Sequence, residues 1–351
     1  MAAVPGAAAP MGGGAMVDEA QASPERETAD LVLEGGGVKG AGLAGAVGVL
    51  ARDHDFHRVA GTSAGAIVAA FVAAGRTHDL ERLTIDTDFA QFLDEGVGGR
   101  FLGPIGNGLD VMLREGMYRG RVLYHWLREN LAAAGITTWG DLRLPGATRR
   151  TPIEHRYRLV VIVSDVSRGR MLRLPWDYER LLGVAPDGMP VADAIRASAS
   201  IPFFFRPWRL PVDPRLTGGR RRLVLTDGGM LSNYPIALFD DEPDHPTIGV
   251  KLSARMALSE TRWQESDNPV SLARALIATM TNAHDQIHVD QPSVASRTIF
   301  VETSGVRSTD FRLDPETKRR LFDNGADAAT DFLASWDYDA WRAAYAPALV
   351  A

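Results

Sequence analysis

A serine among small residues is the stretch best suited to chemistry: Gly61-Thr62-Ser63-Ala64-Gly65. The short segment His57–Ala60 precedes it, and an apolar run of small residues, Ala66–Ala74, follows it. This is the layout of a nucleophile elbow, a sharp strand-to-helix turn that lifts a serine hydroxyl above a sheet. Side chains two residues before and after the serine would collide there, so glycine suits both positions. The pattern predicts a nucleophilic serine, although a tight turn that contains serine by chance has the same letters.

A second glycine-rich stretch has the makings of an anion-binding loop. The apolar segment Leu31–Leu33 runs into Glu34-Gly35-Gly36-Gly37-Val38-Lys39-Gly40, and a helix of small residues, Ala41–Leu50, is predicted to follow. Glycines let backbone N–H groups approach a negative oxygen, and the helix N-terminus adds a favourable potential. The loop also satisfies G-x-G-x-x-G, so dinucleotide binding is an alternative. That interpretation requires an acidic residue at the end of the second strand, whereas Asp53 and Asp55 are predicted to precede that strand.

A serine hydroxyl is a poor nucleophile until a base takes its proton. Asp227 ends the apolar segment Leu223–Leu225, which we predict to be a strand, and Gly228 and Gly229 follow it. If this strand belongs to a parallel sheet, Asp227 lies on the carboxyl-end rim, where ligands bind in α/β folds. The two glycines allow another loop to approach closely. This arrangement favours a carboxylate that contacts Ser63 directly.

A histidine is the alternative base. Ordinary α/β-hydrolases place serine, acid and histidine in that chain order, which His284 or His288 after Asp227 satisfies. The two histidines lie four residues apart in a predicted helix, 271–289, and so share one helix face. Exposure of that face to solvent explains the spacing equally well, and the triad remains open.

The remaining segments supply a sheet and the helices that cover it. Continuous apolar runs predict strands buried on both faces, and apolar residues at helical spacing predict helices. The further predicted strands are Leu159–Val163, Thr247–Leu252 and Thr298–Val301, and the further predicted helices are Tyr118–Ala134, Val191–Ser200 and Asp310–Tyr345. Together these elements predict a single α/β domain with a mainly parallel central sheet flanked by helices and the elbow after its second strand.

Composition sets limits on domains and partners. The chain has 351 residues, no cysteine and a net charge of −6, which exclude disulfides and thiolate sites and give no sign of nucleic-acid binding. Residues 1–28 are rich in Ala, Gly and Pro and predict a disordered tail, whereas 29–351 predict the folded domain, with a helical C-terminal part at 305–351. We see no cluster of metal ligands, no apolar run that would span a bilayer and no signal-peptide pattern, and therefore expect a cytoplasmic protein.

Two segments have compositions that suit a lipid surface. His78–Gly120 combines apolar residues at helical spacing with many glycines, which fits a lid, an apolar substrate wall or an ordinary packed insertion. Arg206–Arg222 gathers arginines around Trp208, which fits contact with anionic headgroups, although a solvated loop explains it as well. These segments lead us to expect transient contact with a membrane surface, and thus a location that is cytoplasmic or peripheral at the membrane.

The ordered motifs resemble those of the patatin-like phospholipase family. The resemblance rests on Gly35–Gly40, Gly61–Gly65 and Asp227–Gly229, and on the segment Ala197-Ser198-Ala199-Ser200-Ile201-Pro202 between the last two. It covers about residues 30–240, and three ordered motifs are far more specific than any one of them. The C-terminal third carries no such signature.

The resemblance implies an acyl hydrolase that cleaves carboxylic esters of phospholipids or other lipids through an acyl-enzyme, with Ser63 as nucleophile and Asp227 as base. No metal or organic cofactor is implied. The implied oxyanion hole consists of backbone amides at Gly36, Gly37 and Val38, with Ala64 as a further donor. Lys39 matches the basic position beside that hole, although a surface lysine or a partner for Glu34 would also occupy this place. A lipid- or nucleotide-sensing module with an inactive site is the non-enzymatic alternative.

Overall fold

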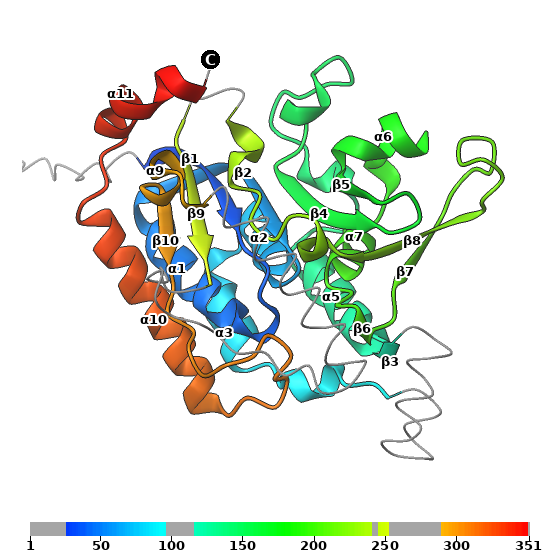
Figure 1. Cartoon of the computed structure of the whole chain (residues 1–351), viewed down its shortest axis with the longest axis horizontal. Helices are drawn as coiled ribbons and strands as arrows, with labels where there is room; N and C mark the ends of the chain where they lie inside the picture. The colour runs from blue at the N-terminus through cyan, green and yellow to red at the C-terminus, as the bar shows by residue number, and fades with distance from the viewer. Residues whose placement is uncertain (1–25, 96–115, 241–244, 253–288, 350–351) are drawn as a thin grey trace, which may run out of the picture.

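The computed structural model describes residues 26–95, 116–240, 245–252 and 289–349 (Figure 1). Its centre is an eight-stranded sheet in the order β10-β9-β1-β2-β4-β8-β7, with β5 also paired to β4. The first five strands of this order are parallel, and β5, β7 and β8 run antiparallel to their neighbours. The strands are β1 (Glu27–Leu33), β2 (His54–Thr62), β4 (Leu159–Asp165), β5 (Arg170–Leu174), β7 (Trp208–Pro211), β8 (Arg222–Asp227), β9 (Thr247–Lys251) and β10 (Thr298–Phe300). A separate pair consists of β3 (Gly116–Tyr118) and β6 (Phe203–Phe205).

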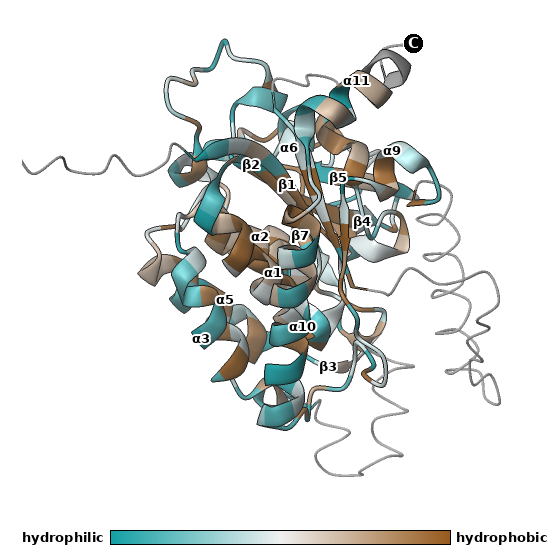
Figure 2. Cartoon of the chain, turned by 90° about the vertical axis from the view of Figure 1, so that its left-hand side faces the viewer, coloured by the Kyte–Doolittle hydropathy of each residue, from teal (hydrophilic) through white to brown (hydrophobic). Residues whose placement is uncertain are grey.

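Helices cover both faces of the sheet, which confirms the predicted α/β class. Alternate residues of each strand point to opposite faces, so Leu31 and Leu33 join the larger apolar cluster and Val32 joins the smaller one. Figure 2 shows α2 and much of α1 as hydrophobic, whereas α10 is banded with hydrophilic residues. The helices are α1 (Gly40–Asp53), α2 (Ala64–Ala73), α3 (Leu80–Ile85), α5 (Arg121–Ala133), α6 (Trp176–Leu182), α7 (Val191–Ser198), α9 (Pro292–Ala295), α10 (Pro315–Leu333) and α11 (Tyr338–Leu349). No helix among these described residues is long and apolar enough to cross a membrane.

Helices α1 and α10 lie side by side because glycines remove the side chains between them (Figure 1). A Cβ atom on Gly45 of α1 would lie 1.9 Å from the carbonyl oxygen of Phe322 in α10. A Cβ atom on Gly325 of α10 would lie equally close, 1.9 Å, to the carbonyl oxygen of Gly42 in α1. The C-terminal third is thereby fixed to the helix that follows the glycine-rich loop.

The N-terminal boundary differs from the prediction. β1 begins at Glu27, and Glu27 and Thr28 pair with His54 and Asp55 of β2, so the predicted tail of 1–28 ends too late. The rest of that tail, residues 1–25, lies outside the described residues. Asp55 belongs to β2 and does not precede it, but it lies near the beginning of the strand, far from the end that a ribose-binding acid would occupy.

The orientation of β8 also differs from the prediction, because β8 is antiparallel to β4. Thr62 at the end of β2 pairs with Ile162 of β4, and the next residue of β4, Val163, pairs with Asp227. Since β4 continues beyond β2, β8 approaches from the far end and stops beside the elbow. Asp227 therefore reaches the expected place from the opposite direction.

Three further elements have different bounds from those predicted. The helix expected at Tyr118–Ala134 begins only at Arg121, and Tyr118 is the last residue of strand β3, which pairs with β6. The segment Arg206–Arg222 contains β7 as well as an exposed loop. The helix expected at Asp310–Tyr345 is divided into α10 and α11. The predicted helix 271–289, with His284 and His288, lies almost wholly outside the described residues.

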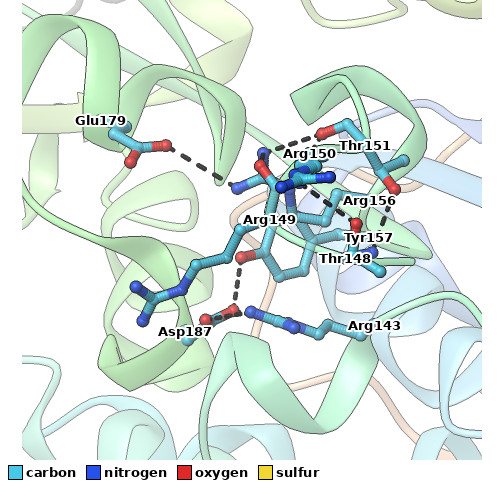
Figure 3. Close-up of polar contacts among 9 residues, drawn as sticks. All are labelled: Arg143, Thr148, Arg149, Arg150, Thr151, Arg156, Tyr157, Glu179 and Asp187. Carbon is cyan, nitrogen blue, oxygen red and sulfur yellow. Dashed lines mark hydrogen bonds and ion pairs between the residues drawn. The ribbon is translucent and has the colours of Figure 1, made fainter. Parts of the chain in front are cut away.

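A polar network joins the connections at the edge away from the elbow (Figure 3). Asp187 accepts hydrogen bonds from Arg143 Nε at 2.9 Å and from the Tyr157 hydroxyl at 2.6 Å, and Figure 3 shows the carboxylate between these two side chains. The Arg143 guanidinium, with a smaller contribution from Tyr157, holds the pKa of Asp187 below its usual value. This carboxylate links the start of β4 to two neighbouring turns and has a structural role.

Candidate active site

Ser63 occupies the strained turn between β2 and α2. Its backbone has φ 52° and ψ −120°, an unusual conformation for a residue with a side chain. A Cβ atom on Gly61 would lie 2.4 Å from the Gly65 carbonyl, and one on Gly65 would lie 2.4 Å from the Leu33 carbonyl oxygen. The close approach of these backbones explains both glycines and confirms the predicted strand–turn–helix geometry.

Asp227 accepts a hydrogen bond from the hydroxyl of Ser63. Ser63 Oγ donates to Asp227 Oδ2 at 2.7 Å, and both residues are buried. The other carboxylate oxygen, Oδ1, accepts the amide of Gly229 at 2.8 Å. A Cβ atom on Gly228 would lie 2.3 Å from the carbonyl oxygen of Ile162, so glycine is required where β8 meets β4. Within the described residues, no histidine contacts either member of this pair.

Burial changes the chemistry of the Asp227 carboxylate. It raises the pKa of Asp227 to about 6, and the hydrogen bonds from Gly229 and Ser63 only partly oppose this shift. The cause is desolvation, which disfavours the charged form of an acid. At neutral pH the group remains mostly ionised, yet it is a stronger base than an exposed aspartate. Such a pKa, near the operating pH, suits proton transfer to and from a hydroxyl.

The glycine-rich loop lies beside this pair. Gly37 has φ +56°, and a Cβ atom there would lie 2.0 Å from the carbonyl oxygen of Ser308. The amide of Val38 donates to that same oxygen at 3.1 Å, which removes Val38 from the predicted oxyanion donors. The amides of Gly36, Gly37 and Ala64 have no acceptor among the described residues. Gly37 and Ala64 line the same cavity as Ser63 and are the best-placed donors.

Backbone and side-chain bonds hold the base of this loop. The Gly35 amide donates to the Asn233 carbonyl at 3.0 Å, and Asn233 Nδ2 donates to the Gly35 carbonyl at 3.0 Å. Glu34 forms an ion pair with Lys251 of β9. Lys39 is buried in the turn before α1, so the alternative of a surface lysine is wrong. Gly40 packs closely under the elbow, since a Cβ atom there would lie 3.2 Å from the Cβ of Ala64.

Ser198 positions the elbow, a role that sequence reasoning missed. Its Oγ accepts the amide of Ser63 at 2.8 Å and donates to the carbonyl of Ile162 at 2.6 Å. Two residues later, the Ser200 carbonyl accepts the amide of Asp227 at 3.0 Å. The segment Ala197–Pro202, noted above only for its resemblance, thus contacts both members of the pair. The serines of this segment were the sequence signal from which this positioning role could have been predicted.

An apolar cavity opens beside Ser63. Its walls come from α2, α3, α5, β6 and the turn 89–92, and Thr84 adds the one other polar side chain of the lining. Phe89 and Phe92 line it, so this part of the segment His78–Gly120 forms a wall of the cavity, and residues 96–115 lie outside the described part. Phe311 from the C-terminal third closes another side, stacked on Phe204 at 5.0 Å between ring centroids. Sequence reasoning missed Phe311 because its neighbourhood carries no motif.

The fold and this site define a class of α/β proteins with a serine at a nucleophile elbow and a carboxylate in direct contact with it. The chain belongs to the patatin-like phospholipase family, whose family model matches residues 31–240. An uncharacterized protein, YqhO, from Bacillus subtilis (strain 168) is 39% identical over 311 residues, covering 88% of this chain and 99% of its own. Among the described residues, no group of three or more His, Cys, Asp or Glu has a geometry that would hold a metal ion.

Solved structures match the chain at low sequence identity. VipD from Legionella pneumophila has a TM-score of 0.50 and 18% identity, covering 89% of this chain and 67% of VipD. ExoU in the ExoU–SpcU complex from Pseudomonas aeruginosa has a TM-score of 0.43 and 18% identity, covering 88% of this chain and 52% of ExoU. The similarity to VipD supports the mixed α/β fold described above.

Proposed function

We propose that this protein is a lipid acyl hydrolase that cleaves carboxylic esters through Ser63 and Asp227. The observation that carries the proposal is the 2.7 Å hydrogen bond from Ser63 Oγ to Asp227 Oδ2 at the wall of an apolar cavity. A nucleophile, a base and an apolar acyl site thus occur together, as ester hydrolysis of a lipid requires. Membership of the patatin-like phospholipase family supports the same reaction class.

The first half of the reaction forms an acyl-enzyme. Asp227 takes the hydroxyl proton as Ser63 Oγ attacks the ester carbonyl, whose oxygen becomes the negatively charged oxygen of a tetrahedral intermediate. The amides of Gly37 and Ala64 lie where they stabilise that charge, with the amide of Gly36 as a further donor. The intermediate then expels the alcohol, which takes the proton from Asp227.

The second half restores the enzyme. Asp227 takes a proton from water, whose oxygen attacks the acyl carbon, and the second tetrahedral intermediate expels Ser63 Oγ. Ser63 recovers the proton from Asp227, and the fatty acid leaves the apolar cavity. One carboxylate therefore serves as base in each attack and as acid in each collapse, a role that its pKa of about 6 suits.

Fluorophosphonate labelling and a lipid panel test this proposal. The purified protein should react with the probe at Ser63 and release fatty acid from at least one phospholipid or neutral ester. Ser63→Ala should lose both properties, whereas Ser296→Ala, a change at an exposed serine, should retain them. Absence of labelling in the wild type would support the alternative of a non-catalytic sensing module.

The ordinary triad makes a different prediction. If His284 or His288 is the base, the double variant His284→Ala/His288→Ala should be as inactive as Ser63→Ala, because triad members act as a unit. With Asp227 as the base, the double variant should keep kcat within a few-fold of the wild type. The comparison is made on one soluble ester, with circular dichroism to confirm folding.

A further inference from the structure

A second hollow lies between the β3–α5 junction and the β6–β7 connection. These two segments run side by side, since the Arg206 amide donates to the Tyr118 carbonyl at 3.0 Å. The described residues that line the hollow include no carboxylate, although the chain as a whole has a net charge of −6. The lining comprises Arg119, Gly120, Arg121, Tyr124, Arg196, Arg206, Pro207, Trp208 and Arg209. The fold thus gathers positive charge at one place on an acidic protein.

Arg196 of α7 is the buried member of this lining, with 2% of its surface exposed. Its guanidinium donates to the carbonyls of Arg119, Gly120 and Arg206 and to Ser200 Oγ, at 2.6–3.2 Å. These four bonds leave one of the five N–H groups of the side chain. All four acceptors are neutral, and no carboxylate contacts the guanidinium among the described residues.

Asp94, the acid whose charge acts on Arg196, is already engaged elsewhere. Asp94 accepts the amides of Gly120 at 2.6 Å and Arg121 at 2.7 Å, and so caps the first turn of α5. Burial lowers the pKa of Arg196 to about 10, and the more distant charge of Asp94 only partly opposes this shift. A buried charge without a contacting counter-ion is costly, so an anion in the hollow would stabilise the fold around Arg196.

A second observation comes from Trp208. Its indole Nε1 is buried and has no hydrogen-bond acceptor among the described residues, although tryptophan N–H groups usually find one when buried. The side chains of Arg119 and Arg121 likewise have no acceptor in the described part of the chain, and both line the hollow with Trp208. The guanidinium donors of Arg119 and Arg121, and the positive charge that they carry, therefore lie at the same hollow.

We propose that this hollow binds a phosphate-bearing anion. Guanidinium groups bind phosphate oxygens in a paired geometry. The hollow is also close to the acyl cavity, because the guanidinium of Arg196 lies 5.3 Å from the ring centroid of Phe205, which lines that cavity. The anion is either the phosphate of a lipid headgroup or that of a soluble phosphoester, and the two sources are separable by experiment.

Inorganic phosphate is the first probe. A ligand that binds only the folded state raises the melting temperature, so millimolar phosphate at constant ionic strength should do so for the wild type. Arg119→Gln/Arg121→Gln should raise the phosphate dissociation constant by about tenfold or more, since two charge-assisted bonds are lost.

The matched control removes the same charge elsewhere. Arg220→Gln/Arg221→Gln changes two exposed arginines in the β7–β8 loop, outside the hollow, and should leave phosphate binding unchanged. If this control weakens binding as much as Arg119→Gln/Arg121→Gln, or if neither pair changes it, the proposed site is wrong. Equal hydrolysis of a soluble uncharged ester by all variants would show that the acyl site is intact.

Vesicles separate the two sources of phosphate. In a Ser63→Ala background, which prevents hydrolysis, flotation with phosphatidylcholine vesicles is compared with and without phosphatidic acid. A lipid headgroup is identified if the protein binds the acidic vesicles more strongly, if Arg119→Gln/Arg121→Gln abolishes this difference, and if the control pair leaves it unchanged. Binding of inorganic phosphate that depends on the same arginines, without vesicle binding, identifies a soluble phosphoester. If Arg119→Gln/Arg121→Gln keeps both phosphate binding and vesicle binding, the proposal is overturned.

Discussion

Asp187 and Asp227 are two carboxylates that the fold treats in opposite ways. Asp187 faces a guanidinium and a phenol at one edge of the molecule (Figure 3), and its pKa is lowered. Asp227 is buried beside a hydroxyl and a backbone amide, and its pKa is raised to about 6. The first carboxylate is stabilised in its charged form, whereas burial keeps the second basic, and no cation among the described residues is in contact with it.

This difference indicates how a structural and a reactive carboxylate can be distinguished. A cation beside Asp227 would lower its pKa and make it a weaker base, so its partners are a neutral hydroxyl and an amide. The raised pKa costs stability at neutral pH, because the folded state then ionises the group less readily than the unfolded chain. The following predictions test whether the two carboxylates differ in this way.

The largest expected effect is on turnover in Asp227→Asn. The amide keeps the shape but cannot take a proton, so kcat/KM should fall about 10³-fold or more. The melting temperature at neutral pH should stay equal or rise, because the stability contribution of Asp227 is present below its unfolded pKa near ~3.9 and is lost as pH rises through about 6. Kinetics on a soluble ester and thermal melts measure both. A marked loss of stability without loss of turnover would give Asp227 the structural role.

The local parts of this site were predictable from sequence. The elbow, the glycine-rich loop and the Asp227-Gly228-Gly229 turn can each be recognised as a short run of residues, because glycine is required wherever another backbone segment comes close. The fold class followed from continuous apolar runs such as Leu159–Val163, whose strand is buried throughout.

The long-range parts were not predictable. The direction of β8 depends on its pairing with β4, and an apolar run has the same composition in either direction. Ser198 contacts the amide of Ser63 across 135 positions of chain, and Phe311 reaches the acyl cavity from a region without motifs. Tertiary pairing with β6 likewise placed Tyr118, the first residue of a predicted helix, in β3. Each of these features depends on a partner that sequence spacing does not identify.

A smaller effect is expected from Ser198→Ala, which tests whether the position of the Ser63–Asp227 pair matters as much as its chemistry. The buried amide of Ser63 would lose its acceptor, which costs about 1–3 kcal/mol of stability. Displacement of the elbow should lower kcat/KM by up to about 10²-fold. Ser200→Ala is the matched control, because the Ser200 hydroxyl bonds Arg196 and not the elbow. Equal loss of activity in both variants would contradict the positioning role.

The pH dependence provides a graded test. With an uncharged ester, kcat/KM of the wild type should fall about tenfold per pH unit below about 6, as Asp227 becomes protonated. A histidine base with a pKa near ~6.5 would give a similar limb. The profile must therefore be repeated on His284→Ala/His288→Ala, where the limb should persist unchanged. Disappearance of the limb in that variant would assign it to a histidine.

The smallest effect is expected from Asp187→Asn, which should change stability and leave catalysis alone. At neutral pH the loss should be about 1 kcal/mol, the scale of a partly exposed ion pair. Since the folded pKa of Asp187 is lowered, its contribution is present above the unfolded pKa near ~3.9 and is lost as pH falls through the folded value. The difference between variant and wild type should therefore shrink in acid, as denaturant melts at neutral and acidic pH will measure.

Arg143→Gln should behave in the same way, because it removes the same charge pair. If kcat/KM of Asp187→Asn instead fell as in Asp227→Asn, the network in Figure 3 would be coupled to the active site, and the two carboxylates would no longer represent separate roles.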